Sequence, residues 1–111
     1  MKDPNNPCIF CEIRKEEFQF ENKLAYSSKD TYPVSEFHSL IVPKRHVETY
    51  FELSNEEIQS CNELILKTKV KILEQDPSVK GFNIGTNVGK SAGQSIFHCH
   101  IHLIPRREGD V

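Results

Sequence analysis

The chain has 111 residues, enough for one compact domain with a hydrophobic core and too few for two independent ones. Its 37% hydrophobic and 27% charged content is that of an ordinary soluble protein, and no segment approaches the roughly 18 apolar residues of a membrane helix. A net charge of -2 provides no general attraction for nucleic acid. We therefore predict a single domain over residues 1–111 whose ligands are neither membranes nor nucleic acid.

The chain begins with a polar segment followed by a pair of cysteines. Residues 1–7 include two prolines and lack the apolar core of a secretory signal, so we expect a cytoplasmic protein whose four cysteines form no disulfides. Cys8 and Cys11 form a Cys-X-X-Cys pair, which indicates either a metal site or a redox site. A structural zinc ion would need two further ligands, and the residues alone do not select them among the five histidines. A short helical turn is expected around residues 8–15.

Four short apolar segments predict strands: 24–26, 39–42, 81–84 and 95–104. The segment from Ser54 to Asp76 predicts one long helix, because Ser54 and Glu57 form a capping box and Asp76 precedes a proline. A loop is expected at residues 30–33. Strands on both sides of a single helix, without regular alternation, predict an α+β domain with a mainly antiparallel sheet.

The predicted helix carries two apolar stripes. The first consists of Ile58, Cys61, Ile65 and Ile72, with Leu64 beside it, and the second consists of Leu66, Val70 and Leu73. A helix on a sheet buries one stripe, so the second indicates contact with another subunit or another part of the fold. Cys61 lies within the first stripe and is expected to be a packing residue.

The segment 95–104 alternates between two kinds of side chain. His98, His100 and His102 share one face of the predicted strand, whereas the opposite, core-facing residues are Phe97, Cys99, Ile101 and Leu103. Histidines two positions apart are about 6.7 Å apart along a strand, which suits an extended ligand such as a chain of phosphates. A neutral imidazole can attack phosphorus. Two other interpretations stay open: an exposed polar face, or a metal site built from two of the histidines.

A loop rich in small residues precedes this strand. Residues 87–95 contain Gly89 and Gly93 among polar side chains, and such loops bring backbone N–H groups close to anions. A plain hairpin turn has the same composition. The position of the loop beside the histidines favours a functional role.

Residues 93–104, Gly-Gln-Ser-Ile-Phe-His-Cys-His-Ile-His-Leu-Ile, resemble the signature of the histidine-triad (HIT) superfamily. Residues 8–11, 38–46 and 81–83 are also similar to bacterial members that contain the cysteine pair. The resemblance implies a single HIT domain with a mainly antiparallel sheet of about five strands, one long helix and one short helix. It also implies a homodimer in which the two sheets join.

The implied activity is that of a nucleotide hydrolase or nucleotidyltransferase. Its substrates would be dinucleoside polyphosphates, nucleoside phosphoramidates or related nucleotides, cleaved at the α-phosphate through a nucleotidyl-histidine intermediate. The resemblance places His98, His100, His102 and Ser95 at the catalytic centre, with His100 as the nucleophile. The implied nucleotide-binding residues are Asp30 for the ribose hydroxyls, Asn87 and His102 for phosphate oxygens, Gly93 in the loop, and Gln94 and Ser95 on the leaving-group side.

The resemblance further implies one structural zinc ion per chain, held by Cys8, Cys11, His46 and His98. Ser28 and Lys29 depart from the family pattern, in which an aromatic residue or a histidine often stands near the base, so base selectivity does not carry over. The alternative function is a non-catalytic nucleotide-binding or zinc-binding protein of the same fold.

Overall fold

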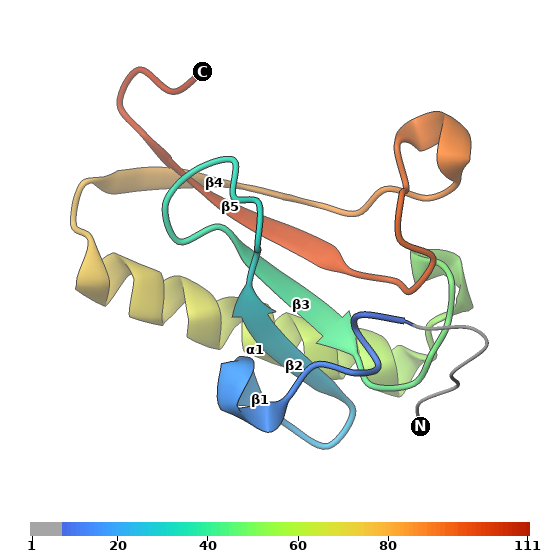
Figure 1. The fold of residues 1–111 in the computed structure, drawn as a ribbon. Helices are drawn as coiled ribbons and strands as arrows, with labels where there is room; N and C mark the ends of the chain where they lie inside the picture. The colour runs from blue at the N-terminus through green and yellow to red at the C-terminus, as the bar shows by residue number, and fades with distance from the viewer. Residues whose placement is uncertain (1–7) are drawn as a thin grey trace.

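The computed structural model describes residues 8–111, which form one antiparallel sheet and one long helix, α1 (Figure 1). The strand order is β1-β2-β3-β5-β4, and every neighbouring pair is antiparallel. The strands are β1 Phe18–Glu21, β2 Ala25–Lys29, β3 Ser39–Pro43, β4 Val79–Gly85 and β5 Ile101–Arg107. Three short 3-10 helices complete the elements: η1 Lys15–Glu17, η2 Tyr50–Glu52 and η3 Lys90–Ala92. The predicted α+β fold is confirmed.

The helix α1 spans Asn55–Gln75, as its capping pattern predicts. The Ser54 side chain accepts a hydrogen bond from the Glu57 N–H (3.1 Å), and the Glu57 carboxylate accepts one from the Ser54 N–H (2.8 Å). At the other end the Asp76 N–H donates a hydrogen bond to the Ile72 carbonyl, and the proline that follows Asp76 cannot continue the helix.

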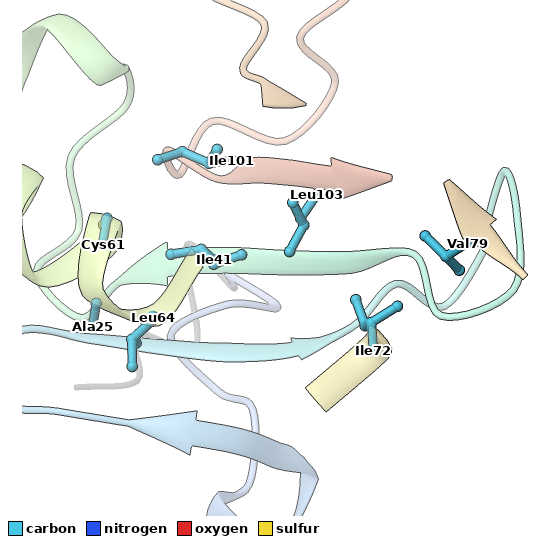
Figure 2. Close-up of a cluster of buried hydrophobic side chains, with 8 residues drawn as sticks. All are labelled: Ala25, Ile41, Cys61, Leu64, Ile72, Val79, Ile101 and Leu103. Carbon is cyan, nitrogen blue, oxygen red and sulfur yellow. The ribbon is translucent and has the colours of Figure 1, made fainter. Parts of the chain in front are cut away.

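The helix lies along one face of the sheet, and the main core fills the space between them (Figures 1 and 2). This core consists of Ala25, Ile41, Cys61, Leu64, Ile72, Val79, Ile101 and Leu103. Because side chains alternate along a strand, the neighbours Leu40 and Val42 of β3 point to the opposite face, where they pack with Phe10 and Tyr26. The sheet therefore has an α1 face and an opposite face.

The second apolar stripe of α1 does not reach this core. Leu66 and Val70 are each 52% exposed, and Leu73 is also exposed. The prediction that only one stripe packs on the sheet is confirmed.

The last strand begins later than predicted. β5 starts at Ile101 instead of Ser95, because residues 95–100 make irregular contacts: the Cys99 N–H donates to the Val47 carbonyl (2.7 Å). The prediction that Phe97 faces the core is wrong, since it is 44% exposed, whereas Cys99 is buried as predicted.

The N-terminal elements also differ from the predictions. β1 was not predicted, and β2 begins one residue later than the segment 24–26 and extends to Lys29. The helical turn expected around residues 8–15 is a turn at Cys8, whose carbonyl accepts from the N–H groups of Cys11 and Glu12, and η1 follows it.

No helix within residues 8–111 is both long and apolar enough to cross a bilayer. The expectation about a leader falls on residues 1–7, which lie outside the described residues.

Candidate active site and metal centre

The start of β5 places two histidines on the face of the sheet opposite α1. Ile101 and Leu103 point into the main core, so His102 between them points the other way. His100, which immediately precedes the strand, packs against Phe10 on that same face. His102 lies directly across from Leu40 in the ladder between β3 and β5. The ring centroids of His100 and His102 are 5.2 Å apart.

The side chain of His100 is oriented by a hydrogen bond to the backbone of His98. Its Nδ1 lies 2.8 Å from the carbonyl oxygen of His98, which can only accept, so Nδ1 carries a proton and the neutral form of the ring has its lone pair on Nε2. Nε2 makes no hydrogen bond within the described residues. The Phe10 ring packs on the imidazole with centroids 4.9 Å apart, and the Thr86 hydroxyl donates to the His100 carbonyl (2.8 Å). In the neutral form of the ring, Nε2 is therefore the nitrogen available to a ligand.

His98 does not share the face of the other two histidines, contrary to the prediction. It is completely buried (0% exposed), and Nε2–H donates to the Pro43 carbonyl (2.8 Å). That hydrogen bond leaves the lone pair on Nδ1. Nδ1 lies 3.4 Å from Sγ of both Cys8 and Cys11 and 3.1 Å from Nδ1 of His46.

These four ligand atoms form a compact cluster. All lie within 4.8 Å of one another, and Cys11 Sγ is 3.2 Å from His46 Nδ1. In a tetrahedral zinc site, with bonds of about 2.3 Å to sulfur and about 2.0 Å to nitrogen, the ligand atoms are about 3.3 to 3.8 Å apart. The cluster therefore fits a four-coordinate metal ion, and the ligand set is the one that the family resemblance implied.

The Cys11 thiol of the cluster is hard to deprotonate. Burial, together with the neighbouring Cys8, raises the pKa of the Cys11 thiol to about 11. A metal ion would have to displace thiol protons, which couples binding to pH. The other two cysteines, Cys61 and Cys99, are buried, and burial raises the pKa of their thiols to about 12 and about 11. They are packing residues, as predicted.

His102 also lies next to a polar group formed by His38 and Asp30. Nδ1 of His102 is 2.9 Å from Nε2 of the buried His38, and Oδ2 of Asp30 is 3.3 Å from that same His38 nitrogen. Oδ1 of Asp30 accepts from the Tyr32 N–H (2.8 Å). No local signal in the sequence links His38 to His102, 64 positions away.

The loop before the histidines is shaped by two glycines. Gly89 and Gly93 have φ angles of +89° and +93°, a region that favours glycine. A Cβ on Gly93 would lie 3.6 Å from Nδ2 of Asn87, so these two predicted site residues are neighbours. Ser95 is exposed at the end of the loop.

Gln94 braces this loop from within. Its amide nitrogen donates to the carbonyls of Glu48 (2.6 Å) and Ile96 (3.1 Å), and its oxygen accepts from the Gly89 N–H (2.9 Å). Because the side chain is buried and its hydrogen bonds are made inside the protein, Gln94 supports the loop instead of presenting its amide to a ligand.

A cavity of about 360 Å³ lies between the cluster of cysteine and histidine ligands and this loop. It is lined by Cys8, Ile9, His46, Glu48, Ser95, Ile96 and Phe97. The cavity adjoins Ser95, so it offers room for a group larger than a single phosphate next to the loop.

Comparison with known proteins gives a consistent result. The HIT domain model matches residues 12–109. The chain is 39% identical to the adenylylsulfatase HINT3 of Arabidopsis thaliana, covering 95% of this chain and 55% of that protein. It is 34% identical to the adenosine 5'-monophosphoramidase HNT1 of Candida albicans, covering 91% and 71%. Among solved structures, a zinc-bound histidine triad family protein from Mycobacterium smegmatis superposes with a TM-score of 0.82 at 29% identity, covering 93% of this chain and 77% of that one.

Proposed function

This chain belongs to the HIT domain family, and from that premise we propose that it is a nucleotide hydrolase or nucleotidyltransferase that acts through His100. The single observation that carries the proposal is the orientation of His100. Its Nδ1–H is held by the His98 carbonyl at 2.8 Å, so the neutral form of the ring has its lone pair on Nε2, which makes no hydrogen bond within the described residues. A neutral imidazole held in this way can attack an α-phosphorus through Nε2.

The reaction would proceed in two displacements. Nε2 of His100 forms a bond to the α-phosphorus, and the P–O or P–N bond to the leaving group breaks, the leaving group keeping the electron pair. Water then attacks the same phosphorus and breaks the P–N bond to His100, which releases the nucleoside monophosphate and restores the imidazole. An acceptor other than water would make the protein a transferase.

The surrounding residues support this reaction by their positions. His102 lies beside the nucleophile, and the loop with Asn87, Gly93 and Ser95 precedes it, so both can donate hydrogen bonds to phosphate oxygens as charge develops. Asp30 would accept hydrogen bonds from ribose hydroxyls. The cavity next to Ser95 would receive the leaving group.

We further propose that the four-ligand cluster holds one zinc ion per chain. Four protein ligands leave no open position, so the ion would stabilise the structure and take no part in the reaction. It would hold in place the two groups that orient His100, which are the carbonyl of His98 and the ring of Phe10. Phe10 stands between Cys8 and Cys11 in the sequence, so a metal bound to both cysteines would also restrain it. The zinc-bound relative from Mycobacterium smegmatis supports this choice of metal.

A homodimer is also proposed. β4 is an edge strand, Ile84 on it is 59% exposed, and the exposed stripe of α1 carries Leu66 and Val70. An apolar groove of about 270 Å³, lined by residues that include Ile58, Ile65 and Ile84, runs between α1 and this edge. A second copy of the chain could cover both surfaces at once.

The decisive test is to trap the intermediate. Purified protein is mixed with an adenosine 5'-phosphoramidate, quenched in denaturant and digested, and mass spectrometry should locate an adenylyl group on His100. His100→Ala should lower kcat at least about 1000-fold and leave nucleotide affinity within about threefold, because only the covalent step is lost. Lys67→Ala, on the exposed side of α1, is the control. Turnover of His100→Ala within tenfold of the wild type would refute the nucleophile, and cleavage of no substrate in a panel would favour the non-catalytic alternative.

A further inference from the structure

Beside the proposed nucleophile, a chain of hydrogen bonds starts at a backbone amide and ends at His102. The Val34 N–H lies 3.0 Å from Nδ1 of His38. Nε2 of His38 lies 2.9 Å from Nδ1 of His102 and 3.3 Å from Oδ2 of Asp30. His38 is 2% exposed, so protein groups and not water determine where its proton resides.

The direction of each hydrogen bond follows from the one before it. A backbone N–H can only donate, so Nδ1 of His38 is the acceptor and the proton of that ring lies on Nε2. This N–H points at Nδ1 of His102, which must accept it, and the proton of His102 therefore lies on its Nε2.

A positive charge on either ring would break the chain. An imidazolium at His38 would place its Nδ1–H against the Val34 N–H. An imidazolium at His102 would place its Nδ1–H against the Nε2–H of His38. Burial lowers the pKa of both histidines, which agrees with two neutral rings. Arg106 acts on the pKa of His38, and His100 and His38 act on the pKa of His102, in the same direction as burial, whereas the Asp30 carboxylate opposes burial at both rings.

We propose that His38 is a positioning residue that fixes His102 as the neutral tautomer with its proton on Nε2, so that His102 donates a hydrogen bond to the substrate's phosphate oxygens but does not protonate the leaving group. The inference rests on the proposed function, because it concerns the same site. It assigns the leaving-group proton to solvent water.

Proton balance leads to this division of roles. If His102 gave its Nε2 proton to the leaving group, the ring would keep none. Within the described residues, the proton aimed at Nδ1 of His102 is that of His38, and His38 cannot take another in exchange because its Nδ1 faces the Val34 N–H. An anionic imidazole would result at one ring or the other. The same proton leaves Nε2 of His38 without a lone pair, which argues against a metal ion bound between Asp30, His38 and His102.

The tautomers can be measured without substrate. Long-range ¹H–¹⁵N correlation spectra of ¹⁵N-labelled protein at pH 7 should show His38 and His102 both neutral and both protonated on Nε2. His38→Gln, whose amide can donate in place of Nε2–H, should keep His102 in this tautomer, whereas His38→Phe should yield a mixture of both tautomers. A wild-type His102 protonated on Nδ1, or on both nitrogens, would overturn the proposal. So would an unchanged tautomer in folded His38→Phe, and if that variant does not fold, the wild type and His38→Gln still decide.

The second measurement separates hydrogen bonding from proton donation. Two adenylate substrates are compared: a p-nitrophenyl ester, whose leaving group departs as a stable anion, and an alkyl phosphoramidate, whose amine must gain a proton. His102→Ala should lower kcat about 100-fold for both substrates, since it removes one donor to the developing charge. A loss at least tenfold greater for the phosphoramidate would show that His102 supplies the proton and would overturn the proposal.

The positioning variants complete the kinetic test. His38→Phe should lower kcat about tenfold with KM changed less than about threefold, and His38→Gln should restore kcat to within about threefold of the wild type. An equal loss in both variants would contradict the role assigned to the donor. If the wild type forms no adduct on His100 and cleaves neither substrate, the proposed function fails, whereas the tautomers measured without substrate still decide the role of His38.

Discussion

At the scale of single residues, Asp30 combines two duties. One carboxylate oxygen accepts from the Tyr32 N–H (2.8 Å), and the other lies 3.3 Å from Nε2 of His38. The Asp30 side chain is 16% exposed, so the carboxylate keeps some access to a ligand. Because the Nε2–H of His38 is directed at His102, Oδ2 of Asp30 keeps its lone pairs for a ribose hydroxyl.

This position predicts a preference for ribonucleotides. A 2'-deoxy substrate would leave a partly buried carboxylate without one hydrogen bond, which costs about 1 to 3 kcal/mol, or roughly 5- to 150-fold in kcat/KM. We expect this ratio between adenosine phosphoramidate and its 2'-deoxy counterpart in the wild type, and a ratio near one in Asp30→Ala. Because this ratio compares two substrates in the same variant, any effect of Asp30→Ala on both substrates through His38 cancels. Equal rates in the wild type would rule out Asp30 as the ribose ligand.

Among single residues, those with a local pattern could be predicted and those with only a distant partner could not. The cysteine pair and the histidine series are visible as short spacings, and the structure brings Cys8, Cys11, His46 and His98 together. His38 has no such spacing, because its partner His102 is 64 positions away. The different orientation of His98 was also hidden, since it depends on a hydrogen bond to Pro43, 55 positions away.

At the scale of elements, the turn that begins at Cys8 carries a testable metal site. We expect about one zinc ion per chain by elemental analysis, and a melting temperature lower by roughly 10 °C or more in Cys8→Ser, because a structural metal contributes directly to folding. Wild-type protein stripped of metal should melt like Cys8→Ser, and stripping should change that variant little. A wild type that binds no metal, or whose melting temperature is unaffected by its removal, would contradict the site.

The first turn of α1 carries a second prediction, at low pH. The hydrogen-bonded Arg45 is the main cause that lowers the pKa of Glu57 from 4.5 to about 2, and the Ser54 N–H adds to it. Because the folded pKa lies below the ordinary value, the carboxylate stabilises the fold above about pH 4.5, and this contribution is lost as the pH falls towards about 2.

Glu57→Gln tests this contribution. At pH 7 it should lower the free energy of unfolding by about 1 to 3 kcal/mol, a range that allows for Arg45 being 57% exposed. Denaturant titrations between pH 7 and pH 2 should show the difference from the wild type shrinking towards zero at the acid end. The control is Glu56→Gln, at an exposed position of the same turn. A difference that stays constant with pH would show that the charge of Glu57 is not what stabilises the helix.

Helix and strand boundaries differ in how far they depend on the rest of the chain. The ends of α1 follow from contacts within four residues, the capping box at Ser54 and the stop at Asp76, so the sequence predicts them to within one residue. The start of β5 depends on the bond from the Cys99 N–H to Val47, a residue 52 positions earlier, and could not be predicted from the local alternation.

At the scale of the whole molecule, the exposed apolar surface of α1 and β4 predicts assembly. Light scattering should return a dimer at micromolar concentration, and Leu66→Glu or Ile84→Glu should convert it to a monomer, because each would bury a charge in the interface. Lys67→Glu, next to the stripe but off it, should leave the dimer intact. A wild-type monomer would contradict the proposed assembly.

The ligands of the metal cluster come from widely separated parts of the chain. Cys8 and His98 are 90 positions apart, and His46 lies between them. A bound ion would act as a cross-link that closes a loop of nearly the whole chain, and for a loop of that length the loss of entropy in the unfolded chain corresponds to about 4 to 5 kcal/mol. During synthesis the cysteines emerge first and must wait for His98 near the other end. The metal can therefore be captured by all four ligands only after β1 to β4 and α1 have been made, and its retention would report that His98 has been brought against the two cysteines.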